Sequence, residues 1–555
     1  MILYGGKSMI NLMIICALVL LMCITSTKIL YKFGVPILLI FMVLGMLFGS
    51  DGLVGIYFND YQLASKVSTI ALIFIMFYGG FGTNWGMAKP VAVQSVFMST
   101  LGVVFTAILT GLFCFFAFKT TLLEGLLIGS IVGSTDAASV FAILRSQRLN
   151  LKGSIASMLE LESGSNDPCA YMLTVIILGL MAGGGYGNII PMILKQVIVG
   201  VIVSVVLAKL SIYLLRHAKF EIEGFYPIFV TAIAVLAYSL SEYFSGNGYL
   251  SVYITGIIIG NSKIPHKKSI FQFFDGISWI MQIMLFFLLG LLAFPSKIPS
   301  VMIKGISISI FMIFVARPVA IFSILYWFKT PIKEEVFISW VGIRGAASLV
   351  FAIFAETYGV SINNDIFHII FFIALFSVAV QGTVIPILAK KLDLIDNEES
   401  VLKTFNDYKE DKSTRLIEFT IDEHNIMANK TIMDANIPED ILVVMIKRNG
   451  DVFVPNGSTE ILPGDILVLS GNKLKHFNEY NEDKSTTLTE VSVEEKSGLI
   501  NKSIKDADIP DDVLIVMIKR KGEVLVPNGN TIINSGDILV ITSNNIEEIE
   551  ELLTV

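Results

Sequence analysis

The chain has 555 residues, of which 54% are hydrophobic and 16% charged, and its mean hydropathy is +0.73. This composition excludes an ordinary soluble domain and places most of the chain in a membrane. The formal net charge of −7 comes mainly from acids behind residue 390, and no Lys/Arg-rich surface suggests nucleic acid as a partner. The four cysteines lie in apolar runs without paired spacing, which excludes a disulfide framework or a cysteine metal site.

Thirteen apolar segments long enough to cross a bilayer follow one another through the first 390 residues. The N-terminus lacks a basic region followed by a small-residue cleavage site, so Met9–Leu30 is interpreted as a retained span and not a signal peptide. The ninth segment is short, so the count could change by one. The expected spans are 10–30, 35–55, 62–82, 90–118, 122–145, 153–182, 187–215, 225–244, 248–261, 271–294, 300–328, 334–358 and 364–389.

Alternate loops between these spans carry the basic residues, whereas the other loops hold mostly acids and glycines. Cytoplasmic loops are enriched in Lys and Arg, so the basic set predicts an N-terminus outside and a C-terminus inside a cell membrane. An odd number of spans satisfies this arrangement. The basic loops hold Lys28, Lys32, Lys89, Arg145, Arg148, Lys152, Arg216, Lys219, Lys263, Lys267, Lys268, Lys329 and Lys333.

Two of the spans, the fifth and the twelfth, carry glycines beside a charge. The fifth contains Gly133 to Asp136, and the twelfth contains Gly342 to Gly345 with Arg344 inside it. Glycine permits local unwinding, and paired broken helices at matching places in two halves indicate the binding site of an inverted-repeat transporter. The alternative is that these glycines only allow close helix packing, which leaves Arg344 unexplained.

The sixth span holds a second polar cluster, from Glu160 to Pro168. Charged side chains at membrane mid-depth are costly and usually line an ion path or pair internally. The alternative is a water-facing loop, but Arg145 to Lys152 already supplies one. Hard oxygen ligands for a cation come from Thr135, Asp136, Ser163, Asn166 and Asp167. Arg344 suits a bidentate pair with a carboxylate such as Glu162.

With these motifs, residues 10–390 resemble the monovalent cation:proton antiporter family, in its sodium/proton-exchanger-like, Asn-Asp branch. The resemblance implies an all-α polytopic fold of about thirteen helices in inverted repeats, usually dimeric, working by alternating access without a cofactor. By that resemblance Asp167 binds cation and proton, Asn166 steadies the site, and Thr135, Asp136 and Ser163 coordinate the cation. Glu162 would pair with Arg344 as a brace. One departure is Tyr78, where relatives often carry an acid.

The tail is expected to comprise a linker at 392–411 and two cytoplasmic α+β modules at 412–481 and 484–555. Residues 429–470 and 501–542 align without a gap, with 27 of 42 positions identical. The modules resemble TrkA-C (RCK-C) domains, without the Rossmann domain that often precedes them. A cyclic dinucleotide is one possible ligand class, and dimerisation without a ligand is equally open. The modules could pair within one chain or across an antiporter dimer.

The sequence therefore predicts a transporter and not an enzyme: an electroneutral K⁺/H⁺ antiporter, or a Na⁺/H⁺ antiporter with the same oxygens. A tail-gated channel is the alternative from another class, although no symmetric filter motif occurs. A receptor would not need buried Asp136 and Asp167, and no intramembrane protease motif is present. Arg317 either faces the ion path or snorkels beside Pro318, and Glu242 is expected at the interface.

Overall fold

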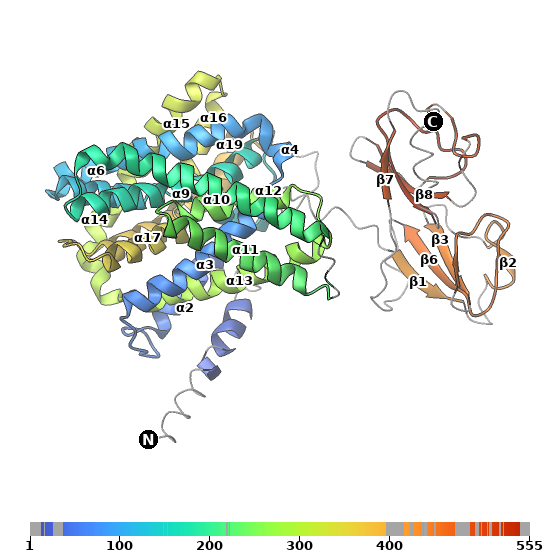
Figure 1. The fold of residues 1–555 in the computed structure, drawn as a ribbon, viewed down its shortest axis with the longest axis horizontal. Helices are drawn as coiled ribbons and strands as arrows, with labels where there is room; N and C mark the ends of the chain where they lie inside the picture. Colours follow the sequence, from blue (N-terminus) through green and yellow to red (C-terminus); the bar gives the residue numbers. More distant parts are fainter. Residues whose placement is uncertain are drawn as a thin grey trace, which may run out of the picture. The chain divides into compact units, whose positions relative to one another are not determined.

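A computed structural model gives the fold, and it divides into two compact units, residues 1–409 and 410–555 (Figure 1). In the first unit the structure describes residues 13–25 except 16, and 37–395 except 148, 153, 218, 219 and 221. In the second it describes 416–421, 427–435, 437, 441–448, 451–471, 489–493, 499–500, 502–507, 509, 513–520, 523–525 and 527–543. Much of the first predicted span, Lys28, Lys32, Arg148, Lys219 and the linker from 396 onward lie outside the described residues.

The first unit is helical, as predicted. Seven of its described helices are long and apolar enough to cross a membrane, and shorter apolar helices lie beside them. The helices are α2 (Ile37–Phe48), α3 (Tyr61–Gly82), α4 (Trp85–Ala88), α5 (Ala92–Phe97), α6 (Val103–Phe118), α7 (Leu122–Ile131), α8 (Ala137–Ser146), α9 (Ile155–Met181), α10 (Ile189–His217), α11 (Phe225–Tyr243), α12 (Gly248–Gly260), α13 (Lys267–Leu292), α14 (Ile298–Phe311), α15 (Arg317–Leu325), α16 (Ile332–Trp340), α17 (Ala346–Thr357), α18 (Ile366–Phe376) and α19 (Gly382–Lys391).

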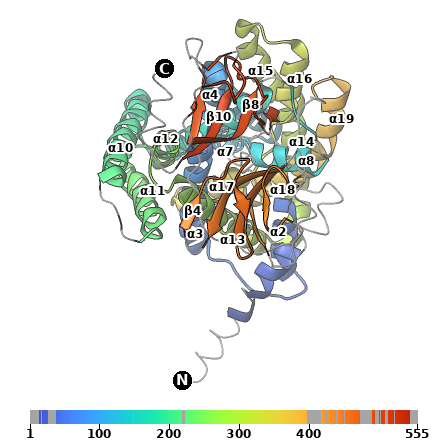
Figure 2. The same cartoon turned by 90° about the vertical axis from the view of Figure 1, so that its right-hand side faces the viewer.

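One group of helices, here called the scaffold, comprises α2, α3 and α10–α13. Within it α2 and α3 pack on α13, and α10 and α11 pack on α12. Figure 2 shows α10, α11 and α12 side by side at the left. Helices α3 and α12 approach so closely that a Cβ on Gly80 would lie 2.3 Å from the carbonyl oxygen of Tyr253. Only glycine fits at that position.

The remaining helices, α4–α9 and α14–α19, form a second group, here called the core. It repeats one pattern: a span with a π-helical turn, η3 (Met98–Gly102) or η6 (Met312–Ala316), is followed by a broken span. A third π-helical turn, η8 (Ser377–Gln381), joins α18 to α19. The first broken span is α7 and α8, and the second is α16 and α17. This matches the inverted repeat expected from the paired glycine motifs. The core meets the scaffold where α17 packs on α3 and α9 packs on α12.

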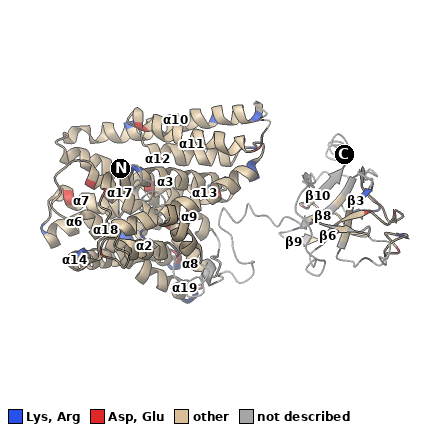
Figure 3. Cartoon of the chain, turned by 90° about the horizontal axis from the view of Figure 1, so that it is seen from below, with Lys and Arg blue, Asp and Glu red and all other residues tan. Residues whose placement is uncertain are grey.

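Charged residues are sparse along the helices and gather near their ends, as Figure 3 shows. Behind α19, the chain turns back onto the loop between α8 and α9. Leu151 pairs with Ile395 in an antiparallel bridge, and the Lys152 amide donates to the Leu394 carbonyl at 2.8 Å. The Lys152 ammonium also lies 3.1 Å from Asp393. Residues 392–395, here called the return segment, are therefore attached to the loop between α8 and α9.

The second unit contains two sheets with the same strand order, β1-β6-β3-β4 and β7-β10-β8-β9, and a two-stranded pair β2-β5. The tail residues that the structure describes form strands and turns with no helix among them, so they leave the helices of the predicted α+β modules untested. The strands are β1 (Leu416–Thr420), β2 (Lys430–Thr431), β3 (Ile441–Arg448), β4 (Asp451–Phe453), β5 (Glu460–Ile461), β6 (Ile466–Gly471), β7 (Thr489–Ser492), β8 (Val513–Arg520), β9 (Glu523–Leu525) and β10 (Ile538–Ser543).

Each module is held by the same ion pair, 72 residues apart in the sequence. Arg448 lies 2.7 Å from Asp465, and Arg520 lies 2.7 Å from Asp537. The hydrogen bond from the Arg520 guanidinium lowers the pKa of Asp537 below its usual range, although burial opposes this shift. The repetition of the pair confirms that the two copies share one fold.

The two modules pack on each other within one chain. Their shared apolar cluster comprises Val444, Met445 and Val468 of the first module with Met517 and Val540 of the second. Strands β3 and β8, which correspond in the two repeats, are in contact there. Of the two arrangements left open by the sequence, pairing within the chain is the one that this structure contains.

Candidate functional site

The two helix breaks lie against each other at the centre of the core. Helix α7 ends at Ile131 and α8 begins at Ala137, while α16 ends at Trp340 and α17 begins at Ala346. The Asp136 amide donates to the Ile343 carbonyl at 2.8 Å, which joins the two unwound segments directly. Gly345 permits this contact, because a Cβ there would lie 2.4 Å from the Asp136 Cβ. Both breaks are therefore needed to place Asp136.

The unwound segments leave backbone carbonyls without helical partners, and Arg344 supplies hydrogen bonds to two of them. Its Nη1 donates to the Gly133 carbonyl at 3.1 Å and to the Ser134 carbonyl at 2.9 Å. Arg344 is almost fully buried, and unpaired backbone groups at membrane depth are costly. The arginine thus stabilises the end of α7.

The predicted pairing of Glu162 with Arg344 is corrected by the structure. Glu162 lies instead against Arg317, with 2.7 Å between Oε1 and Nη2 and 3.0 Å between Oε2 and Nη2. Both side chains are nearly inaccessible, at 1% and 3% exposure. The sequence left two possibilities for Arg317, facing the ion path or snorkelling, and the structure shows neither. Arg317 is buried and paired with Glu162 of α9. Adjacent Pro318 was the only local signal at this position.

An oxygen-rich network connects the first break to α9. Ser163 donates from Oγ to the Thr135 carbonyl at 2.9 Å, and the Ala137 amide donates to the same Oγ at 3.0 Å. Asn166 donates from Nδ2 to Thr135 Oγ1 at 2.5 Å. The Asn166 amide oxygen is buried without a hydrogen-bond partner among the described residues, so it is free to act as a ligand. Asn166 therefore both fixes Thr135 and offers an oxygen.

The two aspartates of the site have different surroundings. Ser134 donates a hydrogen bond to Asp167, which lies on α9 one residue before Pro168. Asp136 accepts hydrogen bonds from the Ser139 hydroxyl at 2.6 Å and the Ser139 amide at 3.2 Å. It therefore acts as the N-cap of α8, a role typical of Asp at a helix start. Ser134 was not among the predicted site residues, although it lies inside the predicted motif.

Asp167 lines a cavity of about 220 Å³ that also reaches Asp136, Thr135 and Ser163, so the structure brings these predicted residues together. The cavity extends along the N-terminal half of α9 to Glu160, between the core and α3, α12 and α13 of the scaffold. Tyr78 lines it and donates to Asp275 of α13 at 2.7 Å. The acid missing at position 78 is thus replaced by one on a neighbouring helix, a contact that the sequence could not indicate.

Comparison with known proteins agrees with this architecture. Residues 17–391 match the family model "Sodium/hydrogen exchanger, transmembrane", and residues 416–473 and 488–554 match the TrkA-C domain. The chain is similar to the K⁺/H⁺ antiporter NhaP of Alkalimonas amylolytica, at 35% identity over 83% of this chain and 81% of that protein. It is also similar to the K⁺/H⁺ antiporter NhaP2 of Shewanella baltica, at 32% identity over 80% and 77%.

Among solved structures, the sodium proton antiporter MjNhaP1 of Methanocaldococcus jannaschii is similar, with a TM-score of 0.60 and 25% identity. The match covers 68% of this chain and 97% of that one. This chain therefore shares the overall fold of that protein. The chain is a multi-pass membrane protein that belongs to the sodium/hydrogen exchanger family and carries two TrkA-C domains behind its transmembrane part.

Proposed function

We propose that this chain is a K⁺/H⁺ antiporter in which one carboxylate, that of Asp167, binds either the cation or the proton. The observation that carries the proposal is the position of Asp167, on a cavity wall beside the crossing breaks and hydrogen-bonded to Ser134. The curated relatives described above are named as K⁺/H⁺ antiporters, which favours potassium over sodium. The chain acts as a transporter and not as an enzyme.

The cation would exchange its water for oxygens that already surround the cavity. Monovalent cations prefer such hard ligands, and Asp167, Thr135 and Ser163 line the cavity together. The Asn166 amide oxygen is buried behind them without a hydrogen-bond partner among the described residues, and a small side-chain movement would add it to this set. Asp136 contributes mainly by capping α8 and holding the break open. Because Asn166 is neutral, Asp167 would be the single exchanging carboxylate, and exchange would be one for one without net charge.

Orientation and assembly follow from loop charge and family membership. The basic loops support an N-terminus outside the cell membrane and TrkA-C modules in the cytoplasm. The chain would form a homodimer in lipid, as relatives usually do. The modules would regulate transport by binding a small ligand such as a cyclic dinucleotide, with different affinity for two transporter states.

The experiment that tests the proposal measures pH-gradient dissipation in proteoliposomes containing the purified full chain. A potassium pulse should dissipate the gradient faster than a sodium pulse, and choline should have no effect. Replacement of Asp167 by Asn retains the side-chain shape but removes the exchanging charge, so the rate should fall by about 100-fold or more. A rate within a few-fold of the unmodified protein would refute the role of Asp167.

The matched control is Asp60→Asn. Asp60 is the N-cap of α3, where its side chain accepts from the Leu63 amide at 2.9 Å. Asn caps helices as well as Asp, so this variant should fold and transport normally. Faster dissipation with sodium than with potassium would favour the Na⁺/H⁺ alternative. Potassium current without proton movement would instead indicate a tail-gated channel.

A further inference from the structure

A second cavity lies on the other side of Asp167 along α9. Its volume is about 440 Å³, and it is lined by Ser65 and Thr69 of α3 together with Tyr171, Tyr238 and Tyr249. Tyr171 is four residues beyond Asp167, so it stands one helical turn farther along the same face of α9. The Asp167 cavity extends the opposite way, toward Glu160. Asp167 therefore lies between two hollows, and only one of them reaches it.

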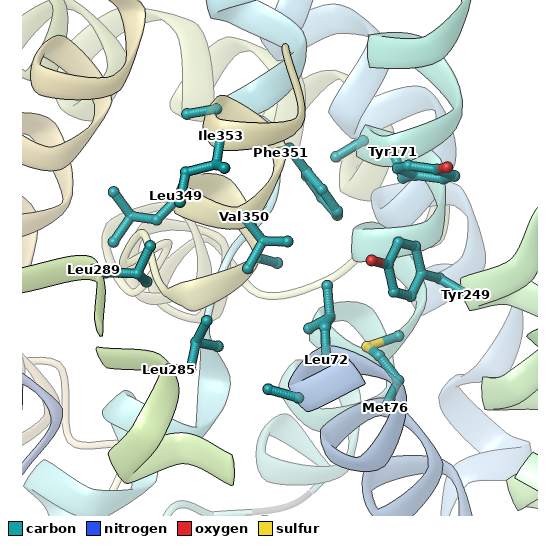
Figure 4. Close-up of a cluster of buried hydrophobic side chains, with 14 of the residues drawn as sticks. Leu72, Met76, Tyr171, Tyr249, Leu285, Leu289, Leu349, Val350, Phe351 and Ile353 are labelled. Carbon is teal, nitrogen blue, oxygen red and sulfur yellow. The ribbon is translucent and has the colours of Figure 1, made fainter. Parts of the chain in front are cut away.

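The two cavities are separated by a closely packed layer, here called the aromatic layer, formed by Tyr171, Tyr249 and Phe351. Its ring centroids are 4.8 Å apart for Tyr171 and Tyr249 and 5.6 Å apart for Tyr171 and Phe351. Figure 4 shows these rings gathered beside Leu72 and Met76, two residues that also line the Asp167 cavity. Each of the three rings is at most 5% exposed, so the layer excludes water.

The layer joins helices from both groups. Tyr171 and Phe351 belong to α9 and α17 of the core, whereas Tyr249 belongs to α12 of the scaffold. Separation of the core from the scaffold at this end would open the second cavity to Asp167. The same movement would have to break the contacts within the layer, so their strength sets how often it opens.

Polar contacts behind the rings tie the layer to α11. The ring of Tyr249 lies between those of Tyr171 and Tyr238, with centroids 4.8 Å and 5.1 Å away. The hydroxyl groups of these tyrosines interact with one another, with the Glu242 carboxylate and with Thr69. Glu242 is itself fixed, because it accepts from the Gly248 amide at 2.9 Å. Glu242 was predicted as an interfacial residue. That position stays a prediction, and Glu242 in addition begins a row of polar contacts that ends at the second cavity.

We propose that the aromatic layer is the closed gate on the Tyr171 side of Asp167, and that Glu242 and the three tyrosines latch it. The proposal rests on the proposed antiport function, since it assigns these residues to the step that exposes Asp167 to the second side. They are positioning residues, because they act on the access of ions to Asp167 and not on the ion. Loss of the Tyr171 hydroxyl should favour the state in which this side is open.

The test measures thiol labelling of a cysteine at the Asp167 cavity, in full-length protein whose four native cysteines are replaced by alanine. The reporter is Met76→Cys, and a membrane-impermeant maleimide is applied to one face of the membrane at a time, in cells and in inverted vesicles. In protein that carries Met76→Cys alone, the cysteine should be labelled only from the membrane face that connects to the Glu160 end of the cavity. Ser65→Cys, which lines the second cavity, reports reagent access from the other face.

The latch variants are Tyr171→Phe and Tyr249→Phe, which keep the rings and remove only the hydroxyl groups. One hydrogen bond shifts a two-state equilibrium by about 2- to 12-fold, so Met76→Cys labelling through the Tyr171 side should rise by that factor. Labelling through the Glu160 end should not rise. The control Tyr243→Phe, on an exposed residue of α11 outside the layer, should leave both rates unchanged.

Equal labelling rates in all variants would overturn the gate, as would a rise from both faces, which indicates general loosening. Two latch variants are used so that the test does not depend on the folding of one. The labelling rate of each is compared with that of the unmodified protein only where the gel-filtration profiles match. Labelling requires no transport, so a failure of the gate proposal can be distinguished from a failure of the proposed antiport function. If Asp167→Asn abolishes exchange while labelling is unaltered in the latch variants, only the gate is wrong. If Asp167→Asn still transports while the latch variants shift labelling, the proposed function is wrong.

Discussion

At the scale of single residues, the membrane core of this protein depends on buried arginines with different partners. Arg317 neutralises Glu162, whereas Arg344 donates to the carbonyls of Gly133 and Ser134. Removal of one member of a buried ion pair typically costs about 3–5 kcal/mol, because the other charge stays buried and unpaired. The two arginines therefore protect different groups, although both lie near the same break.

This difference can be measured by double-mutant cycles on thermal unfolding of the detergent-purified protein. Arg317→Ala should destabilise strongly, and its effect should shrink when Glu162→Gln is already present. Arg344→Ala should also destabilise, through its carbonyl partners, and its effect should change less on the Glu162→Gln background. Arg216→Ala, at an exposed arginine near the end of α10, is the control and should be nearly neutral. A larger coupling energy for Glu162 with Arg344 than for Glu162 with Arg317 would support the pairing of Glu162 with Arg344 that the sequence predicted.

At the scale of elements, the broken helices could be predicted because glycine beside a charge is a local signal. The oxygen ligands from Thr135 to Asp167 could be predicted for the same reason. The partner of Glu162 could not, because Arg317 and Arg344 are equally suitable residue types and only the fold, which brings Arg317 of α15 to α9, decides. The contact of Tyr78 with Asp275 joins segments that are distant in the sequence, and so does the aromatic layer. Periodicity along the chain therefore could not predict either of them.

The return segment at 392–395 gives a prediction at this scale. Leu394 is buried and its carbonyl accepts from Lys152, so this segment belongs to the transport unit although the predicted domain boundary lies at 391. A chain that ends after residue 395 should keep exchanging cations, with altered pH or ligand dependence. A chain that ends after residue 391 should in addition lose thermal stability. Equal melting temperatures of the two shortened chains would show that the segment contributes nothing.

At the scale of the whole molecule, a single exchanging carboxylate has a consequence for energetics. If Asp167 carries either a proton or a cation and Asn166 stays neutral, a complete cycle moves no net charge. After a potassium pulse to proteoliposomes, the initial rate of internal alkalinisation should be the same with and without valinomycin, which sets the membrane voltage. A clear dependence on voltage would show that a second acid, with Asp136 or Asp275 as candidates, takes part.

The tail places its two modules in one polypeptide, and only the 17 residues from 472 to 488 lie between the last strand of the first module and the first strand of the second. Tethered partners meet at an effective concentration of about millimolar or more, whatever the amount of protein in the membrane. Association of Met445 and Val468 with Met517 and Val540 is thus a first-order process that dilution cannot reverse. The pairing of modules within one chain is therefore independent of the abundance of the transporter, and each molecule carries both members of the pair.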